Sequence, residues 1–286
     1  MMHFPKDLFI NIKKPIDNAI EYMVRNWGPI FDAISDGLRT MLFYIRSAVE
    51  IIPWWLLIAL VFFAAYKTSK TSKKLSSAIL YSALLFFIGL IGLWDMMNAT
   101  LTIIIASVII SLLLGFPLGL LVAQSKRANV IVRPVLDTMQ TMPSFVYLIP
   151  AVMLLGLGNV PAVVATTIYA MPPIVRMTSH GIQQVDAEVV EASKSFGATR
   201  FQMLTKVLIP QALPTIMTGV NQTIMMAISM VVTSSMIGAT GLGSEVLKGI
   251  NRLESGRGFA AGTAIVIIAI IIDRLTQSLG MRKEKA

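Results

Sequence analysis

The chain has 286 residues, of which 55% are hydrophobic and 14% are charged, and its mean hydropathy is +0.74. A soluble domain would be about one quarter charged and would lack long apolar runs, so we expect an all-α polytopic membrane protein. The net charge of +9 is spread over short loops, which is typical of a membrane protein's cytoplasmic charge bias and not of nucleic-acid binding.

The first 50 residues are expected to stand apart from the membrane spans. Residues 1–29 mix polar and apolar side chains around three prolines and show no clear period. From residue 30 to residue 51, apolar residues recur with helical spacing while charged residues lie off that face. Because charges are costly inside a bilayer, we expect an amphipathic helix in the membrane interface; a span packed against protein is the alternative.

Seven apolar segments follow, and each is expected to form a spanning helix: 52–67, 76–94, 99–123, 144–157, 160–177, 213–236 and 259–276. Pro117, Pro150 and the pair at 172–173 predict kinks. The expected divisions are an N-terminal segment 1–50, two additional spans in 51–96, a core in 97–277 and a basic tail 278–286.

Basic residues set the expected orientation. They gather in the loop 67–74, the loop 124–133, the loop 186–210 and the C-terminal tail. The positive-inside rule places these loops and the C-terminus in the cytoplasm, and the N-terminus outside. The basic residues within the first 50 positions do not fit this rule.

Loop 186–210 is a polar island between two apolar spans. Asp186 is a candidate N-cap for a helix over 187–196, Gly197 a candidate left-handed end, and a second helical segment over 198–208 leads to Pro210. The pattern resembles the EAA loop of ABC importer permeases, which reads Glu-Ala-Ala, three residues, Gly, nine residues, Ile-x-Leu-Pro. Ser193 and Val207-Leu208-Ile209-Pro210 are conservative departures from it.

Segments 139–150, 170–178 and 237–246 are similar to glycine betaine/proline permeases, in the same order around the loop. The chain thus resembles the osmoprotectant branch of type I ABC importers. The resemblance implies the type I permease fold over the core, a homodimer on two ABC ATPase subunits and an extracellular betaine-binding protein. It also implies import of glycine betaine or proline in a prokaryotic plasma membrane. The residues that it assigns to ATPase coupling are Glu191, Ala192, Ser193, Gly197 and Pro210.

No nucleotide site or catalytic constellation is visible in the sequence. The chain lacks the Gly-x-x-x-x-Gly-Lys-Ser/Thr pattern, so ATP and Mg²⁺ are expected on partner subunits and this subunit is expected to be non-catalytic. We expect no cofactor or metal in the chain, because it has no cysteine and its two histidines, His3 and His180, are far apart in sequence.

Polar residues on the sixth span offer a candidate translocation path. They share one helical face, with Asn221 beside it: Thr218, Gln222, Met225, Ser229 and Thr233. Interhelical hydrogen bonding and lining of the path both remain open. Tyr147 and Tyr169 are candidates for cation–π contact with a quaternary ammonium, although tyrosines also serve as packing residues or interfacial anchors.

Other functions also remain open. The same machinery could carry choline, carnitine or an amino acid such as methionine. An ion-coupled transporter or a channel would need paired intramembrane carboxylates or a pore motif, and Asp95 and Asp273 lie at span ends. A structural membrane anchor is a third class, and the polar face and broken helices argue against it.

Overall fold

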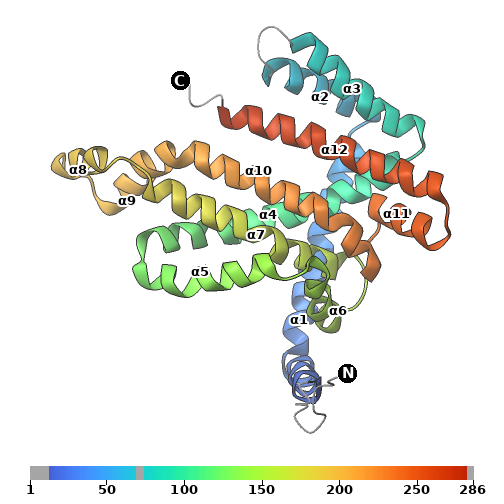
Figure 1. The fold of residues 1–286 in the computed structure, drawn as a ribbon, viewed down its shortest axis with the longest axis horizontal. Helices are drawn as coiled ribbons and strands as arrows, with labels where there is room; N and C mark the ends of the chain where they lie inside the picture. Colours follow the sequence, from blue (N-terminus) through green and yellow to red (C-terminus); the bar gives the residue numbers. More distant parts are fainter. Residues whose placement is uncertain (1–12, 69–73, 282–286) are drawn as a thin grey trace, which may run out of the picture.

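The computed structural model describes residues 13–68 and 74–281, which are helical throughout apart from short connections, with no strand among them. The elements in chain order are α1 (Lys13–Ile51), α2 (Trp54–Thr68), α3 (Lys74–Leu90), α4 (Trp94–Gln124), α5 (Lys126–Thr141), the 3-10 turn η2 (Ser144–Tyr147), α6 (Leu148–Leu155), α7 (Asn159–Gln183), α8 (Ala187–Ser195), α9 (Arg200–Met203), the π-turn η3 (Leu204–Leu208), α10 (Ile209–Ser234), the 3-10 turn η4 (Ser235–Ile237), α11 (Leu242–Asn251) and α12 (Ser255–Met281) (Figure 1).

Helix α7 lies at the centre of the bundle, between α4 and α10 (Figure 1). Of its most apolar 18-residue stretch, 67% is buried, the largest share among the spanning helices. On α4 a small residue recurs every fourth position toward α7, at Ser107, Ser111, Gly115 and Gly119. A Cβ at Gly119 would lie 2.7 Å from the Cβ of Thr178, so the two backbones approach as closely as glycine permits.

The contact between α7 and α10 is equally close. A Cβ at Gly219 would lie 2.6 Å from the Cβ of Met177, and one at Gly181 would lie 3.0 Å from the Cβ of Thr215. Small residues therefore bring both neighbours of α7 into direct backbone contact, which is how helices associate where no hydrophobic force drives them together.

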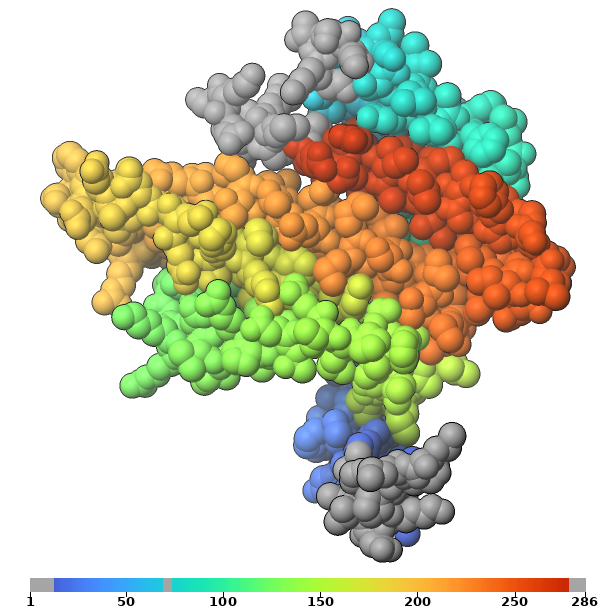
Figure 2. Space-filling model, in the orientation of Figure 1, coloured from blue at the N-terminus to red at the C-terminus, as the bar shows by residue number. Residues whose placement is uncertain are grey.

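The two additional N-terminal helices pack on the side of α12. Leu85 and Ile88 of α3 share a buried cluster with Met97 of α4 and Ile267 and Ile271 of α12. Figure 2 shows α2 and α3 resting on α12, away from α5 and α7.

The all-α membrane fold is confirmed, but fewer helices can span than the predicted seven. Length and composition identify four spanning helices in the described residues, α4, α7, the α9–α10 unit and α12, or up to six if each of two bent pairs counts as one span. Those pairs are α1 with α2, bent by 87°, and α5 with the segment 144–155, bent by 112°. Helix α3 has 17 residues and is about 26 Å long, slightly shorter than a bilayer core of about 30 Å.

The predicted second span, 76–94, is the one absent from both counts, and the predicted fourth span, 144–157, enters only as one arm of a bent pair. The α-helical part of this fourth span, α6, has eight residues and is about 12 Å long, well short of a bilayer core. The predicted end of the second span is also corrected: α3 ends at Leu90, and Trp94 opens α4.

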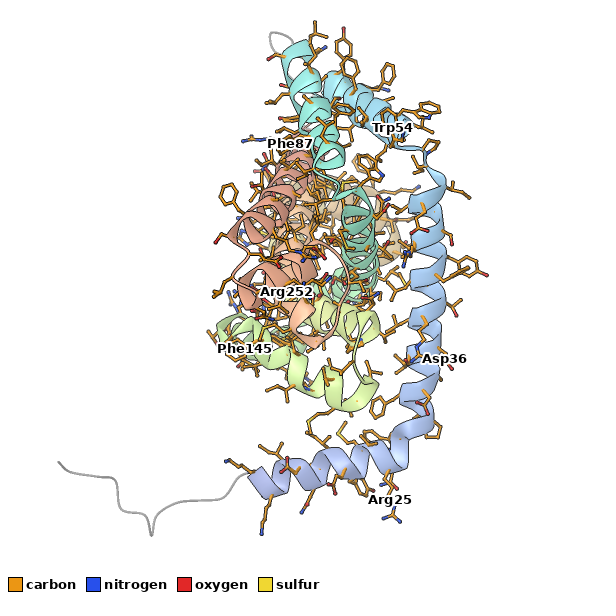
Figure 3. The ribbon with its side chains drawn as sticks, turned by 90° about the vertical axis from the view of Figure 1, so that its right-hand side faces the viewer. Arg25, Asp36, Trp54, Phe87, Phe145 and Arg252 are labelled. Carbon is orange, nitrogen blue, oxygen red and sulfur yellow. The ribbon has the colours of Figure 1, made fainter. Side chains whose placement is uncertain are left out.

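Helix α1 begins at Lys13, so residues 13–29, which show no clear period in the sequence, are helical; residues 1–12 lie outside the described part. Figure 3 shows it bending between the labelled Arg25 and Asp36, and Pro29 lies in that stretch. Beyond the bend it runs across the bundle, with Leu38 and Leu42 against the cluster that contains Tyr147. From residue 38 onward the predicted apolar face packs inward, whereas Ile30 and Ile34 at its start are exposed. Placement in the membrane interface stays a prediction.

Candidate functional site

The first half of loop 186–210 folds as predicted. Asp186 Oδ1 accepts a hydrogen bond from the backbone N–H of Glu188 at 2.9 Å and caps α8. At the other end, Gly197 has φ +78°. Its N–H donates to the carbonyl of Lys194 at 2.9 Å, and that of Ala198 to the carbonyl of Ser193 at 3.1 Å. This pair of bonds is a Schellman motif, so the glycine fixes the direction in which the chain leaves α8.

The second half differs from the single predicted helix over 198–208. Thr199 and Gln202 form a reciprocal capping box that starts the four-residue α9. The chain then widens into the π-turn η3 before α10, which has Pro210 in its first turn. Proline has no N–H to donate and its ring crowds the carbonyl four residues earlier, which accounts for the wider turn.

The knob formed by α8 and α9 projects from one end of the bundle, and neither helix has a buried residue (Figure 1). Two aromatic side chains on it face solvent: Phe196 is 92% exposed and Phe201 is 74% exposed. Glu191 is exposed too, and among the described residues it forms no ion pair. The knob thus offers an aromatic and acidic surface that the chain itself leaves uncovered.

The remaining predicted coupling residues are placed around this surface. Ala192 is exposed on α8, and Ser193 is half-buried with its hydroxyl donating to the carbonyl of Val189 at 2.8 Å. Pro210 is exposed at the start of α10, at the base of the knob. The structure therefore brings the predicted coupling residues onto one projecting unit.

The predicted polar face of α10 is only partly exposed. Thr218, Gln222 and Ser229 are exposed, whereas Met225 and Thr233 are half-buried. The hydroxyls of Thr218 and Ser229 donate to carbonyls of their own helix, at 3.2 and 2.9 Å. Gln222 is thus the exposed amide on this face.

Asn221 turns away from that face and joins α10 to α12. Its Nδ2 donates to Asp273 Oδ1 at 2.8 Å, and its Oδ1 accepts from the hydroxyl of Thr276 at 2.5 Å. Gln277 donates to the same Asp273 oxygen at 2.7 Å. This cluster is the interhelical hydrogen bonding that the sequence offered as one alternative, and it gives the Asp273 carboxylate two amide donors.

Tyr147 and Tyr169 do come together, as an edge-to-face pair with ring centroids 6.0 Å apart. Tyr147 is buried and its hydroxyl donates to the carbonyl of Met139; Tyr169 is half-buried. The pair ties η2 and α5 to α7, so its visible role is packing.

An ion cluster at the α11–α12 corner was not predicted. Glu245, 6% exposed, accepts from Lys248 Nζ at 2.8 Å and from Arg257 Nε at 2.7 Å. The hydrogen bond from Lys248, reinforced by Arg257, holds the pKa of Glu245 below its ordinary value against the opposing effect of burial. The spacing of Glu245 and Lys248 was a visible signal, but the Arg257 contact depends on the turn between the two helices.

The loop before α11 is fixed to two other helices. The N–H of Leu242 donates to Thr100 Oγ1 at 2.8 Å, and Asn159 Oδ1 accepts from the N–H of Thr240 at 2.9 Å. The N–H of Gly158 donates to the carbonyl of Ile237 at 2.9 Å. These hydrogen bonds hold the loop before α11 against α4 and α7 at the end of the bundle opposite the knob (Figure 1).

Together, the close-packed helices and the projecting knob define a membrane-embedded transport subunit. Residues 115–285 match the family described as "Binding-protein-dependent transport system inner membrane component", and the chain belongs to that family. It is 46% identical over 267 residues to the glycine betaine/proline betaine transport system permease protein ProW of Escherichia coli K12, covering 93% of this chain and 74% of that protein. It is 45% identical to the glycine betaine/carnitine transport permease protein GbuB of Listeria monocytogenes, covering 93% and 94% of the two chains.

Solved structures agree on the fold. An inward-facing MetNI methionine ABC transporter aligns with a TM-score of 0.59 at 22% identity, over 70% of this chain and 97% of that one. The resemblance to osmoprotectant ABC permeases and the type I importer fold are thus confirmed.

Proposed function

We propose that this chain is the permease subunit of an ATP-driven importer for glycine betaine. The substrate is inferred from one observation: along 93% of its length the chain is 46% identical to a relative whose name specifies glycine betaine and proline betaine. A second relative's name adds carnitine, so carnitine is the alternative substrate. Membership of a binding-protein-dependent family supports an ATPase partner and an extracellular binding protein.

The knob of α8 and α9 is the proposed docking element for the ATPase. Its exposed Phe196 and Phe201 would fill a groove on that partner, and Glu191 would meet a basic or hydrogen-bonding group there. ATP and Mg²⁺ belong to the partner, and this subunit carries out no chemistry of its own. Movement of the docked knob would then switch the permease between outward-open and inward-open states.

The functional unit is proposed to be a homodimer with the translocation path between its two copies. The exposed face of α10 supports this, because Gln222, Thr218 and Ser229 are polar groups on a spanning helix and must face water or protein. A second copy across this face would enclose a polar channel.

The proposed orientation rests on the charge distribution: the knob and the C-terminus lie in the cytoplasm and the N-terminus outside. Termini on opposite sides require an odd number of crossings, so α3 would cross the membrane in addition to the six spans that length and composition allow. The cysteine-free chain allows a direct check. A cysteine placed at Asn18 should react with an impermeant reagent added outside intact cells. Reaction only after the cytoplasmic side is exposed would reverse the orientation.

The substrate is tested by uptake. The chain would be co-expressed with an ABC ATPase and a betaine-binding protein from the same organism, purified as a complex and placed in proteoliposomes. We expect ATP-dependent accumulation of labelled glycine betaine, with competition by carnitine measured in parallel. Failure of the ATPase to co-purify, or uptake that proceeds on an ion gradient without ATP, would overturn the proposal.

A further inference from the structure

A cavity of about 350 Å³ lies near α6, but a larger one, about 550 Å³, opens among α1, α2, α3 and α4. It is lined by three aromatic side chains and three polar ones: Trp54, Phe86, Trp94, Glu50, Asp95 and Asn98. The rings of Trp54 and Phe86 are 6.3 Å apart between centroids. Figure 3 places Trp54 at the turn where α1 passes into α2. This volume is that of a small-molecule site.

The polar groups of the cavity are two carboxylates and one amide whose oxygen lacks a donor among the described residues. Asn98 is only 8% exposed, and its Oδ1 has no hydrogen-bond partner in the described structure. A buried acceptor without a donor is costly and calls for an explanation. Asp95 is exposed in the first turn of α4, and Glu50 is paired with Arg46 at 2.7 Å. With two carboxylates and one guanidinium, the site keeps a net negative charge.

We propose that this cavity binds a small organic cation with an alkylated ammonium group. The faces of Trp54, Trp94 and Phe86 attract such a cation through their quadrupoles, and its methyl groups suit an apolar wall. Asp95 supplies the opposite charge. A zwitterion such as glycine betaine fits less well, because its carboxylate would meet Asp95 and Glu50.

The proposed site is separate from the proposed transport function. None of its lining residues belongs to α10 or the knob, so the site could exist whatever the chain transports. Two sources offer the same ammonium chemistry: a free cation such as choline, and the headgroup of an amine phospholipid, whose phosphate would stay outside the cavity. Trp54 is 55% exposed and Phe86 45% exposed on helices α2 and α3, which are apolar on all sides, so both sources have access.

The probe is choline, added to the full chain in nanodiscs made only of phosphatidylglycerol, which contains no amine. Intrinsic fluorescence reports occupancy, because two of the four tryptophans line the cavity. We expect a saturable change with choline and at least a fivefold weaker one with glycine betaine. Asp95→Asn should weaken choline binding about tenfold, corresponding to a cation pairing of roughly 1.4 kcal/mol.

The matched control is Trp55→Phe, which removes an equally exposed neighbouring tryptophan that does not line the cavity and should leave choline affinity unchanged. Because Asp95 also lies at a helix N-terminus, Phe86→Leu provides a second variant without a charge change, and it too should weaken binding. Thermal unfolding of each variant shows that the fold persists. No saturable signal, or unchanged affinity in both well-folded cavity variants, would overturn the site.

Repeating the titration in nanodiscs with phosphatidylcholine or phosphatidylethanolamine separates the sources. Unchanged choline affinity assigns the site to a free cation. A weaker apparent affinity, together with amine lipid retained by the wild type and lost by Asp95→Asn, assigns it to a lipid headgroup.

Discussion

Substitution of Gly197 tests the backbone geometry of the knob separately from the side chains on its surface. Gly197 has φ +78°, and a Cβ built on it meets no heavy atom within 4 Å. Any cost of a side chain therefore comes from the left-handed conformation and not from crowding within the chain. Alanine pays roughly 1 kcal/mol there, asparagine less because it tolerates this region, and a β-branched residue more.

The expected order of damage is Gly197→Asn, then Gly197→Ala, then Gly197→Val. If docking selects the observed geometry, each 1.4 kcal/mol of backbone cost weakens the affinity for the ATPase about tenfold. Valine should then reduce docking affinity by about tenfold or more, and asparagine by only about twofold. Membrane insertion should be unchanged in all three, because the knob makes no buried contact.

The assay is binding of the partner ATPase to the permease in nanodiscs, with Ser195→Val as the control. That substitution also adds a β-branched residue at the exposed end of α8, but on a helical backbone. Wild-type affinity for Gly197→Val would refute the conformational argument. Equal losses for asparagine and valine would instead assign the effect to a side chain blocking the dock.

Three other predictions follow from the packing and the charges. Gln222→Leu should lower uptake while leaving thermal stability unchanged. Asn221→Leu should lower stability by about 1–3 kcal/mol, because Asp273 loses the amide donor that joins α10 to α12; equal stability of the two variants would contradict the assignment. Gly119→Ala should destabilise the α4–α7 contact by about 1–3 kcal/mol in thermal or denaturant unfolding, whereas Gly262→Ala, with open space around it, should be neutral. Because the pKa of Glu245 is lowered in the fold, its ionised form stabilises the α11–α12 corner above pH 4.5, and this stability should fall as the pH drops below that value. In Glu245→Gln this contribution to the pH dependence of the melting temperature should be absent. The same dependence of melting temperature on pH in the variant and the wild type would contradict the ion cluster.

The parts of the chain that could be predicted from sequence are those that depend on neighbouring residues. The cap at Asp186 and the left-handed Gly197 act within a few positions of α8, and both appear as expected. The π-turn after α9 was not predicted, because the spacing of apolar residues does not show that the turn before Pro210 becomes wider than an α-helical turn.

Contacts between distant segments could not be predicted. Apolar composition over 144–157 indicates that the segment is sheltered from water, but not that it bends by 112° from α5 and stops after one short helix. Asn221 was placed beside the polar face from the sequence, but its bond to Asp273, 52 residues away, which fixes it between two helices, could not be predicted. A pattern of polar residues thus locates a helical face, whereas tertiary packing determines which of those side chains stay exposed and which bond to another helix.

The most direct test of the account is the amount of glycine betaine accumulated per ATP hydrolysed by the reconstituted complex, for wild type, Glu191→Ala and Gly197→Val. Glu191 is exposed on the knob and Gly197 sets its geometry, so both variants should insert normally but lose substrate stimulation of the ATPase and accumulate less glycine betaine per ATP hydrolysed, with Gly197→Val the more severe. Normal stimulation and normal accumulation in both variants would contradict the claim that loop 186–210 couples ATP hydrolysis to transport.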